Sequence, residues 1–229
     1  MDQVAALLHD SRLFTSLDHS SIERMAKLFS LQRIEKHQML AACGEPCTRV
    51  YIIDSGSVRV FLSAPDGRER VVCIARRGSC ISSPWAWTGE PNCMTAEVHE
   101  GGLAATIAGS HLQKAGARDA SIGSSILRHA CWTTALLAEK LTEQCFESVH
   151  QRVVRVLLGC VRDIGADAHD VEIHLTHEQI GDLAGTAREC ATREIHHLAE
   201  TGAVSIAGYR SIRVLPDVLK RLLEEKPAP

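Results

Sequence analysis

The side chains best suited to chemistry lie on one face of a predicted helix near the end of the chain. A helical wheel from 188 to 200 places the polar residues together: Arg188, Glu189, Thr192, Arg193 and His196. The apolar residues fall on the opposite side: Ala191, Ile195, Leu198 and Ala199. An arginine can bind O6 and N7 of guanine through two N–H groups, and a glutamate can accept from N4 of cytosine. The pattern therefore predicts a helix that packs on a core and reads DNA bases.

Two helix starts lie close together in front of this face, and both match the capping-box pattern. Thr176–Gln179 and Thr186–Glu189 each have Ser/Thr followed three residues later by Glu/Gln. Gly185 stands between them, where the chain must turn. After Gly202 the sequence alternates around Ala207-Gly208, as expected of a hairpin. Helix, turn, helix and hairpin together predict a winged helix-turn-helix.

Contacts to the DNA backbone are expected from hydroxyls, helix N-termini and the hairpin. The candidate residues are Thr176, His177, Thr186, Arg210 and Ser211. Glu189 has an alternative role to base reading, because it can instead close the second capping box. From 149 to 229 there are ten Lys/Arg against twelve Asp/Glu, with six of the twelve histidines. A DNA-binding domain usually has a basic surface, so the contacts should be few and local.

The first half of the chain has the pattern of a small β-domain. Turn signals at Ser55-Gly56, Pro65–Gly67 and Gly101-Gly102 separate runs rich in β-formers. Before them, Asp18 can cap a short helix whose apolar residues have helical spacing. Several short strands spaced by turns predict a sandwich or barrel. A β-domain without any ligand would show the same pattern.

A long helix is expected to follow, because the turn signals stop between about 119 and 149. Its apolar stripe consists of Ile122, Ile126, Leu136, Leu137 and Leu141. A helix of this length needs a partner along it, so a homodimer seam is expected, with a solvated connector as the alternative.

Composition excludes several classes of protein. The chain has 229 residues, 45% of them apolar, and a net charge of −3. No apolar run approaches the roughly 18 residues of a membrane helix, and the first residues have no signal-peptide pattern. Nine cysteines without such a signal favour a reducing cytoplasm. No Gly-x-Ser-x-Gly, phosphate-loop or HExxH motif is present, so an enzyme is not expected.

The whole layout resembles the Crp/Fnr family of bacterial transcription regulators. "GTARECATREI" is similar to the family's Arg-Glu-x-x-x-Arg recognition helix, and "GEPCTRVYIIDSGSVRVF" and "APDGRERVVCIARRG" resemble its β-roll segments. The resemblance implies that Arg188, Glu189 and Arg193 read a TGTGA-like half-site and that a dimer reads a palindrome. The implied partners are double-stranded DNA, a second copy of the chain and RNA polymerase.

The expected fold is therefore α+β, in three parts. A cupin-like, effector-sensing β-roll occupies 1–118, a long dimerisation helix 119–148, and a winged helix-turn-helix 149–229. The signal would bias two arrangements of the long helix and so the spacing of two recognition helices, which requires different affinities for the two states.

The family's cyclic-nucleotide pocket is where this sequence departs from the pattern. That pocket has a Gly-Glu pair and then Arg-Ser about ten residues later, where the arginine pairs with the phosphate. Here Ser82-Ser83 and Met94-Thr95 occupy those places, and no arginine lies between Arg77 and Arg118. A buried phosphate without a cation is costly. The sequence argues against cyclic AMP.

An apolar, aromatic lining could replace that pocket. The candidate effector residues are Ser82, Ser83, Trp85, Trp87, Met94 and Thr95. Such linings hold small apolar or aromatic ligands, and the stretch resembles that of halogenated-phenol and aromatic-acid sensors of the family. The tryptophans would suit an ordinary core equally well.

The cysteines offer an alternative signal, either redox or gas. Five lie in the β-domain: Cys43, Cys47, Cys73, Cys80 and Cys93. Thiolates can hold an iron–sulfur cluster or zinc, and Cys73, Cys80, His99 or His37 could hold haem. The oxygen-sensing branch of the family uses an N-terminal cysteine cluster, whereas residues 1–42 contain no cysteine.

A thiol switch is a further option for the pair Cys43 and Cys47. It would require both thiols to be exposed and to have a lowered pKa. Otherwise the cysteines are small apolar residues, as single buried cysteines usually are.

Overall fold

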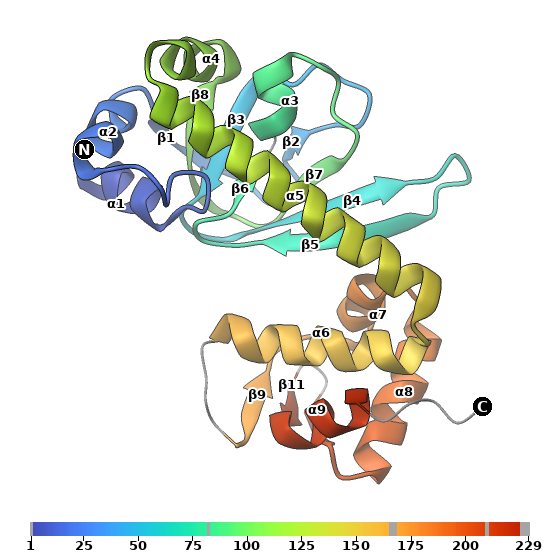
Figure 1. The fold of residues 1–229 in the computed structure, drawn as a ribbon. Coiled ribbons are helices and arrows are strands. Elements are labelled where there is room, and N and C mark those ends of the chain that lie inside the picture. Colours follow the sequence, from blue (N-terminus) through green and yellow to red (C-terminus); the bar gives the residue numbers. More distant parts are fainter. Residues whose placement is uncertain (1, 82, 165–168, 209–210, 225–229) are drawn as a thin grey trace. The chain divides into compact units, whose positions relative to one another are not determined.

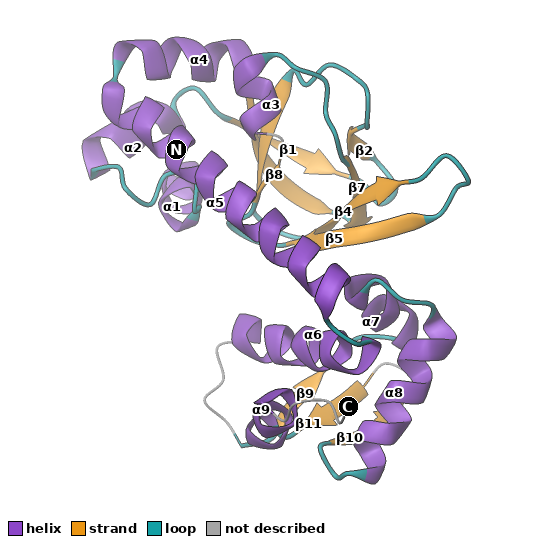
Figure 2. Cartoon of the chain, turned by 45° about the vertical axis from the view of Figure 1, so that its right-hand side comes forward, coloured by secondary structure: helices purple, strands orange, loops and turns teal. Residues whose placement is uncertain are grey.

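The computed structural model of the protein describes residues 2–81, 83–164, 169–208 and 211–224. They form two compact units, Met1–Ala138 and Glu139–Pro229. Both units combine helices with sheets (Figures 1 and 2), which confirms the predicted α+β class. In the described part of the chain, no helix is long and apolar enough to cross a membrane.

The N-terminal unit consists of two antiparallel sheets flanked by helices. One sheet has the order β1 (Ser30–Ile34), β8 (Gly102–Ala108), β3 (Arg49–Ile53) and β6 (Cys80–Ile81). The other has the order β2 (Met39–Ala41), β7 (Thr95–Glu100), β4 (Ser57–Ser63) and β5 (Glu69–Ala75). The helices are α1 (Asp2–Asp10), α2 (His19–Ala26), α3 (Ser83–Thr88), α4 (Gly109–Arg118) and the start of α5 (Ala120–Phe146). This arrangement confirms the predicted β-roll.

Strand β3 shows why both faces of one sheet are buried. Successive side chains of a strand point to opposite faces. Val50 and Ile52 therefore pack with the helices in one cluster, whereas Tyr51 and Ile53 pack between the two sheets in another. The nearly continuous apolar run of this strand follows from that double burial.

The predicted turns of the β-roll are confirmed. Strands β4 and β5 pair around Pro65–Gly67, where the N–H of Ala64 donates to the carbonyl of Arg68 at 2.8 Å. Asp18 caps α2, since its side chain accepts from the N–H of Ser21. Helices α3 and α4 are not among the predicted elements, because their sequences lack a clear apolar period or a capping residue.

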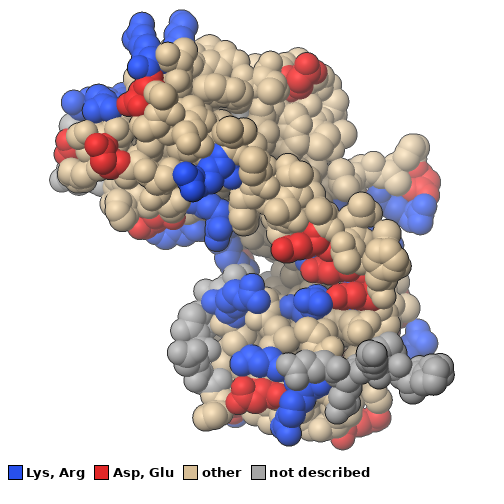
Figure 3. Space-filling model, viewed as in Figure 1, with Lys and Arg blue, Asp and Glu red and all other residues tan. Residues whose placement is uncertain are grey.

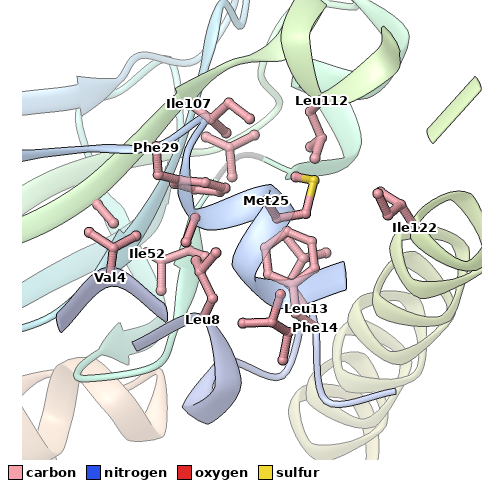
Figure 4. Close-up of a cluster of buried hydrophobic side chains, with 14 of the residues drawn as sticks. Val4, Leu8, Leu13, Phe14, Met25, Phe29, Ile52, Ile107, Leu112 and Ile122 are labelled. Atoms are coloured by element: carbon pink, nitrogen blue, oxygen red, sulfur yellow. The ribbon is translucent and has the colours of Figure 1, made fainter. Parts of the chain in front are cut away.

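The helical cluster of the N-terminal unit also holds the first turns of α5. In Figure 4 the side chains of Phe14, Met25 and Ile122 converge from three segments of the chain. Phe14 also meets Phe29 edge to face, with ring centroids 6.0 Å apart. Ile122 and Ile126 are buried there, whereas Leu141 of the same predicted stripe is exposed. The stripe therefore divides into a buried beginning and an exposed continuation.

His129 of α5 is a titratable group inside this unit. It is only 5% exposed, and its ring lies 5.7 Å from that of Trp132. Burial, together with the nearby charge of Arg12, lowers the pKa of His129 to about 4 from its usual 6.5. The folded chain therefore holds this imidazole neutral at pH values where the unfolded chain protonates it.

We expect stability to fall as the pH drops from about 6.5 to 4, because the unfolded state then binds one more proton than the folded state. The full effect is roughly 3 kcal/mol in the free energy of unfolding. Urea unfolding at several pH values checks it, with His129→Gln as the comparison. The difference in the free energy of unfolding between wild type and His129→Gln should change between pH about 6.5 and 4. Parallel pH curves would contradict the assignment.

In the described part of the C-terminal unit, helices pack on a small sheet. Its helices are α6 (Val149–Ile164), α7 (His177–Ala184), α8 (Arg188–Glu200) and α9 (Pro216–Glu224). Its sheet has the order β10 (Val204–Gly208), β11 (Ser211–Val214) and β9 (Val171–Ile173), all antiparallel. The order helix, helix, hairpin after β9 confirms the predicted winged helix-turn-helix.

Candidate nucleic-acid interface

The first helix of the motif, α7, begins at a complete capping box. The side chain of Thr176 accepts from the N–H of Gln179 at 3.1 Å, and the side chain of Gln179 accepts from the N–H of Thr176 at 2.8 Å. Two N–H groups that would otherwise lack partners are satisfied. The predicted first capping box is confirmed.

Gly185 makes the turn between the two helices. It closes α7 in the left-handed conformation, with φ of 65°, which glycine adopts without a steric cost. A Cβ atom at this position would also collide with the side-chain amide of Gln144. Gly181, one turn earlier, lets α8 approach, because a Cβ there would lie 3.4 Å from that of Ala191. Glycine at both positions explains how α7 and α8 can pack together although only three residues separate them in the sequence.

The predicted second capping box is wrong. Helix α8 begins at Arg188, so its N-cap is Ala187, which has no side chain able to cap. Thr186 lies one residue too early, and Glu189 is the second residue of the helix rather than the third. Glu189 therefore does not close a capping box, and its exposed carboxylate is available for another role.

Helix α8 has the two faces that the sequence predicts. Ala191, Ile195 and Leu198 are each 0% exposed in the core of the unit. The exposed residues of the opposite face include Arg188, Glu189, Arg193 and His196, whereas Thr192 is partly buried. Arg193 makes one weak contact, at 3.7 Å from the sulfur of Cys190. The structure brings the predicted base-reading residues together on one surface, apart from Thr192 at its edge.

His177 connects the start of α7 to this surface. Its Nδ1 atom lies 3.2 Å from the hydroxyl of Thr192, and its ring meets that of His196 edge to face at 6.1 Å. Burial lowers the pKa of His177, and the charges of His196 and Arg188 lower it further. His177 is therefore neutral at pH 7. Its contact with Thr192 links the start of α7 to α8 and helps to hold the two helices together.

Two described polar residues of the hairpin, Ser211 and Arg213, lie close to acidic side chains. The hydroxyl of Ser211 donates to the carboxylate of Glu172 on the neighbouring strand. A phosphate placed there would face that negative charge. Arg213 lies 3.7 Å from Asp170, and Arg210 lies outside the described residues. Thr186 is partly buried between the helices.

Charges on the C-terminal unit are mixed. Figure 3 shows basic and acidic side chains interspersed on the visible face of this unit. This agrees with the near balance of charge in the sequence from 149 to 229. Any DNA contact in this unit depends on individual residues such as those of α8, rather than on a broad basic surface.

Comparison with known proteins identifies both parts of the chain. Residues 31–119 match the model of the cyclic nucleotide-binding domain, and residues 151–222 match that of the Crp-like helix-turn-helix domain. The chain belongs to the Crp/Fnr family of transcription regulators. It is thus a DNA-binding regulator of that type, with relatives that are regulators rather than enzymes.

Relatives of this Crp/Fnr regulator align along most of its length. A CRP-like cAMP-activated global transcriptional regulator of Mycobacterium tuberculosis is 26% identical over 91% of this chain and 93% of its own. The anaerobic regulatory protein of Bacillus subtilis is 21% identical over 80% and 79%. The structure of FixK2 from Bradyrhizobium japonicum superposes with a TM-score of 0.75 at 21% identity, over 88% and 99%. One of these relatives is named for activation by cAMP and another for anaerobic regulation, so family membership leaves the signal open.

The candidate effector residues of this Crp/Fnr regulator fall into two groups. Trp85 and Trp87 lie in α3, partly buried against the helical cluster. Met94 packs instead against the cluster between the sheets, and Thr95 begins β7. Ser82 and the side chain of Ser83 lie outside what the structure describes. Trp85 and Trp87 lie on the same helix and pack against the same cluster. Met94 packs against a different one.

The five cysteines of the β-roll do not form a single group. Cys47 belongs to the helical cluster and Cys80 packs against it, whereas Cys73 packs against the cluster between the sheets. Cys43 and Cys93 are exposed. Among the described residues, no three His, Cys, Asp or Glu side chains are grouped so that they could hold a metal ion. A switch between Cys43 and Cys47 requires both thiols to be exposed, and this condition is not met, because Cys47 is buried with its sulfur 3.5 Å from the carbonyl of Arg49.

Thr176 provides a test of backbone positioning in this regulator. Thr176→Ala removes the N-cap acceptor and should lower the free energy of unfolding by about 1 kcal/mol. Because a phosphate contact carries no sequence information, DNA affinity should fall by a similar factor on every sequence. Urea unfolding and fluorescence anisotropy on matched and scrambled DNA measure both effects. Thr176→Ser should behave as wild type. Loss confined to one sequence would assign Thr176 to base recognition.

Proposed function

We propose that two copies of this chain bind a palindromic, TGTGA-like DNA site and regulate transcription in response to a signal other than a cyclic nucleotide. The observation that carries the DNA part is the exposed face of α8. Arg188, Glu189 and Arg193 stand on a helix whose other face is fully buried. Their types suit guanine and cytosine edges, and a rigid helix holds them in register.

Binding to DNA of defined sequence tests this directly. Fluorescence anisotropy would compare a palindrome of two TGTGA half-sites with a scrambled duplex at one fixed salt concentration, since affinity depends strongly on salt. We expect the palindrome to bind at least about 10³-fold more tightly. Equal affinity for the two duplexes would overturn the assignment of α8 as a sequence reader.

The proposal that the signal is not a cyclic nucleotide is supported by the lack of an arginine to pair with its phosphate. No arginine lies between Arg77 and Arg118. Arg77 itself is ion-paired with Asp54 and, at 3.2 Å, with Asp10. The M. tuberculosis relative is cAMP-activated, but this chain lacks the arginine that would neutralise a cyclic phosphate. We expect isothermal titration with cyclic AMP to show no binding.

A small apolar or aromatic ligand is the proposed signal. Trp85 and Trp87 are partly buried on α3, where flat apolar molecules can stack on their rings. The ligand would bias two arrangements of α5 through different affinities for them. Quenching of tryptophan fluorescence by aromatic acids and phenols, lost in Trp85→Leu but retained in Trp132→Leu, would support this site.

A redox or gas signal is the alternative, and one spectrum separates it from the first. Protein purified without oxygen would be examined by visible absorption and by iron and zinc analysis. A Soret band or a broad charge-transfer band with stoichiometric metal would identify haem or an iron–sulfur cluster. A colourless, metal-free protein would favour the tryptophan site, because the described thiols are spread over separate clusters.

A further inference from the structure

Two exposed thiols lie side by side where β2 and β7 approach each other. Ala41 pairs with Ala96, and Pro46 forms an isolated bridge with Pro91. Four residues lie between these pairings on each side, 42–45 and 92–95. Each segment contains one cysteine, Cys43 or Cys93. The pairing thus joins residues that are 50 positions apart in the sequence.

A tight turn fixes Cys43 against the opposite segment. The N–H of Glu45 donates to the carbonyl of Ala42 at 3.2 Å, and Gly44 takes the left-handed conformation with φ of 82°. The N–H of Cys43 donates to the hydroxyl of Thr95 at 3.2 Å. The N–H of Gly44 donates to the carbonyl of Asn92 at 2.8 Å. These bonds leave little freedom in the position of Cys43.

The same hydrogen bonds place Cys43 beside the segment 92–95. Its segment is bonded to Asn92 and to Thr95, and only Cys93 and Met94 lie between those two residues. Asn92 and Thr95 are buried, at 5% and 8% exposed, and Met94 packs against the cluster between the sheets. Cys93 is therefore the residue of this segment that is exposed to solvent, as Cys43 is on its own side.

The thiols are also close enough to influence each other. The pKa of Cys93 is raised, first by partial burial and second by the neighbouring Cys43. Cys93 therefore ionises less readily, and Cys43 is the thiol that reacts first with an oxidant. The pairings of Ala41 with Ala96 and of Pro46 with Pro91 place Met94 opposite Cys43 and Gly44 opposite Cys93, so the two cysteines are diagonal neighbours, one step apart. With segments about 4.8 Å apart and a rise of about 3.3 Å per residue, such neighbours have Cα atoms roughly 6 Å apart. Disulfides span Cα separations of about 4.4–6.8 Å.

We propose that Cys43 and Cys93 are an oxidation site that closes to an intramolecular disulfide when the chain meets a two-electron oxidant such as hydrogen peroxide. One thiolate attacks a peroxide oxygen, and the O–O bond breaks. The attacked oxygen stays on the sulfur as a sulfenic acid, and the other oxygen takes up protons and leaves as water. The second thiolate attacks that sulfur, the S–S bond forms, and a second water leaves. Two thiols and one peroxide thus give one disulfide and two waters, with the two sulfurs supplying both electrons.

Differential alkylation of the full-length, reduced protein tests the site. The protein would be treated with hydrogen peroxide, and the remaining thiols alkylated under denaturing conditions. Mass spectrometry should show the loss of two of the nine thiols and a peptide that joins Cys43 to Cys93. Dithiothreitol should restore all nine. Linkage of either cysteine to another residue, or oxidation of both without linkage, would overturn the proposal.

Matched variants separate the site from general thiol reactivity. Cys43→Ser and Cys93→Ser should each abolish the linked peptide. A Cys131→Ser, Cys145→Ser double variant should form it in wild-type yield, because those two cysteines are also exposed in the single chain but lie on α5. The readout uses no DNA. A chain that binds DNA but forms no linkage would contradict this site alone and leave the proposed function intact.

Discussion

Replacement of both arginines of the α8 face by alanine is expected to abolish sequence-specific DNA binding while the fold is kept. Each bidentate arginine–guanine contact contributes about 1–3 kcal/mol of discrimination. Arg188→Ala and Arg193→Ala should therefore each lower the preference by about 5- to 150-fold for each half-site, and the palindrome contains two half-sites. Both side chains are exposed, so the free energy of unfolding should change by less than about 0.5 kcal/mol.

The lysine variants distinguish base reading from simple charge. Arg188→Lys keeps the positive charge but cannot form the two parallel hydrogen bonds of a guanidinium. We expect it to lose discrimination nearly as alanine does while retaining binding to scrambled DNA. Anisotropy on a set of duplexes with one changed base pair each would show where specificity is lost. With Arg188→Ala, the affinity should no longer depend on which base pair stands at a single position of each half-site.

A control and a contradicting outcome are available within the same unit. Arg221→Ala removes an exposed arginine from α9 and should leave the preference unchanged. Equal loss on every sequence for Arg188→Ala would assign Arg188 to the phosphate backbone. Unchanged binding in the double variant would remove α8 from the interface altogether.

Local signals in the sequence predict most of the winged helix-turn-helix correctly. The capping box at Thr176, the turn at Gly185 and the apolar period of 191–198 each specify structure within a few residues. The second capping box failed for a local reason. Thr186 and Glu189 have the right spacing, but the chain leaves the turn one residue later, so the helix starts at Arg188.

The β-roll could be predicted as strands and turns, but its sites could not. Whether Trp85 faces a ligand or a core depends on α3 packing against the helical cluster, which no local pattern encodes. The C-x₃-C spacing of Cys43 and Cys47 suggested a pair. In the fold, Cys47 lies two residues before β3 and is buried in the helical cluster. The segment of Cys43 is instead hydrogen-bonded to the segment that contains Cys93. Such contacts depend on tertiary pairing over tens of residues.

The exposed apolar residues of α5 lead to the second large expected effect. Leu127 and Leu141 are each 65% exposed, and Phe146 at the helix end is 83% exposed. Leu127, Thr134 and Leu141 recur every seven residues along a helix of 27 residues, about 40 Å long. A seven-residue recurrence of this kind is the pattern of a helix that pairs with another. The seam that buries these residues is expected to come from a second copy of the chain.

Leu127→Glu combined with Leu141→Glu should therefore convert the protein from dimer to monomer. Burying one leucine side chain contributes about 1.5–3 kcal/mol, and symmetry makes each substitution count in both copies. The dissociation constant of the dimer should rise by more than about 10³-fold, which sedimentation velocity can measure. Because both side chains are exposed in the single chain, circular dichroism should show an unchanged fold.

DNA binding then reports whether the seam serves the proposed function. A monomer engages one half-site, so affinity for the palindrome should fall to that for a duplex with a single half-site, since the advantage of linked binding is lost. Leu62→Glu, on β4 and 45% exposed, introduces the same charge outside α5 and should leave dimer and affinity unchanged. A double variant that stays dimeric would place the seam elsewhere. A monomer that keeps full affinity for the palindrome would show that pairing through α5 does not determine the spacing of the two recognition helices.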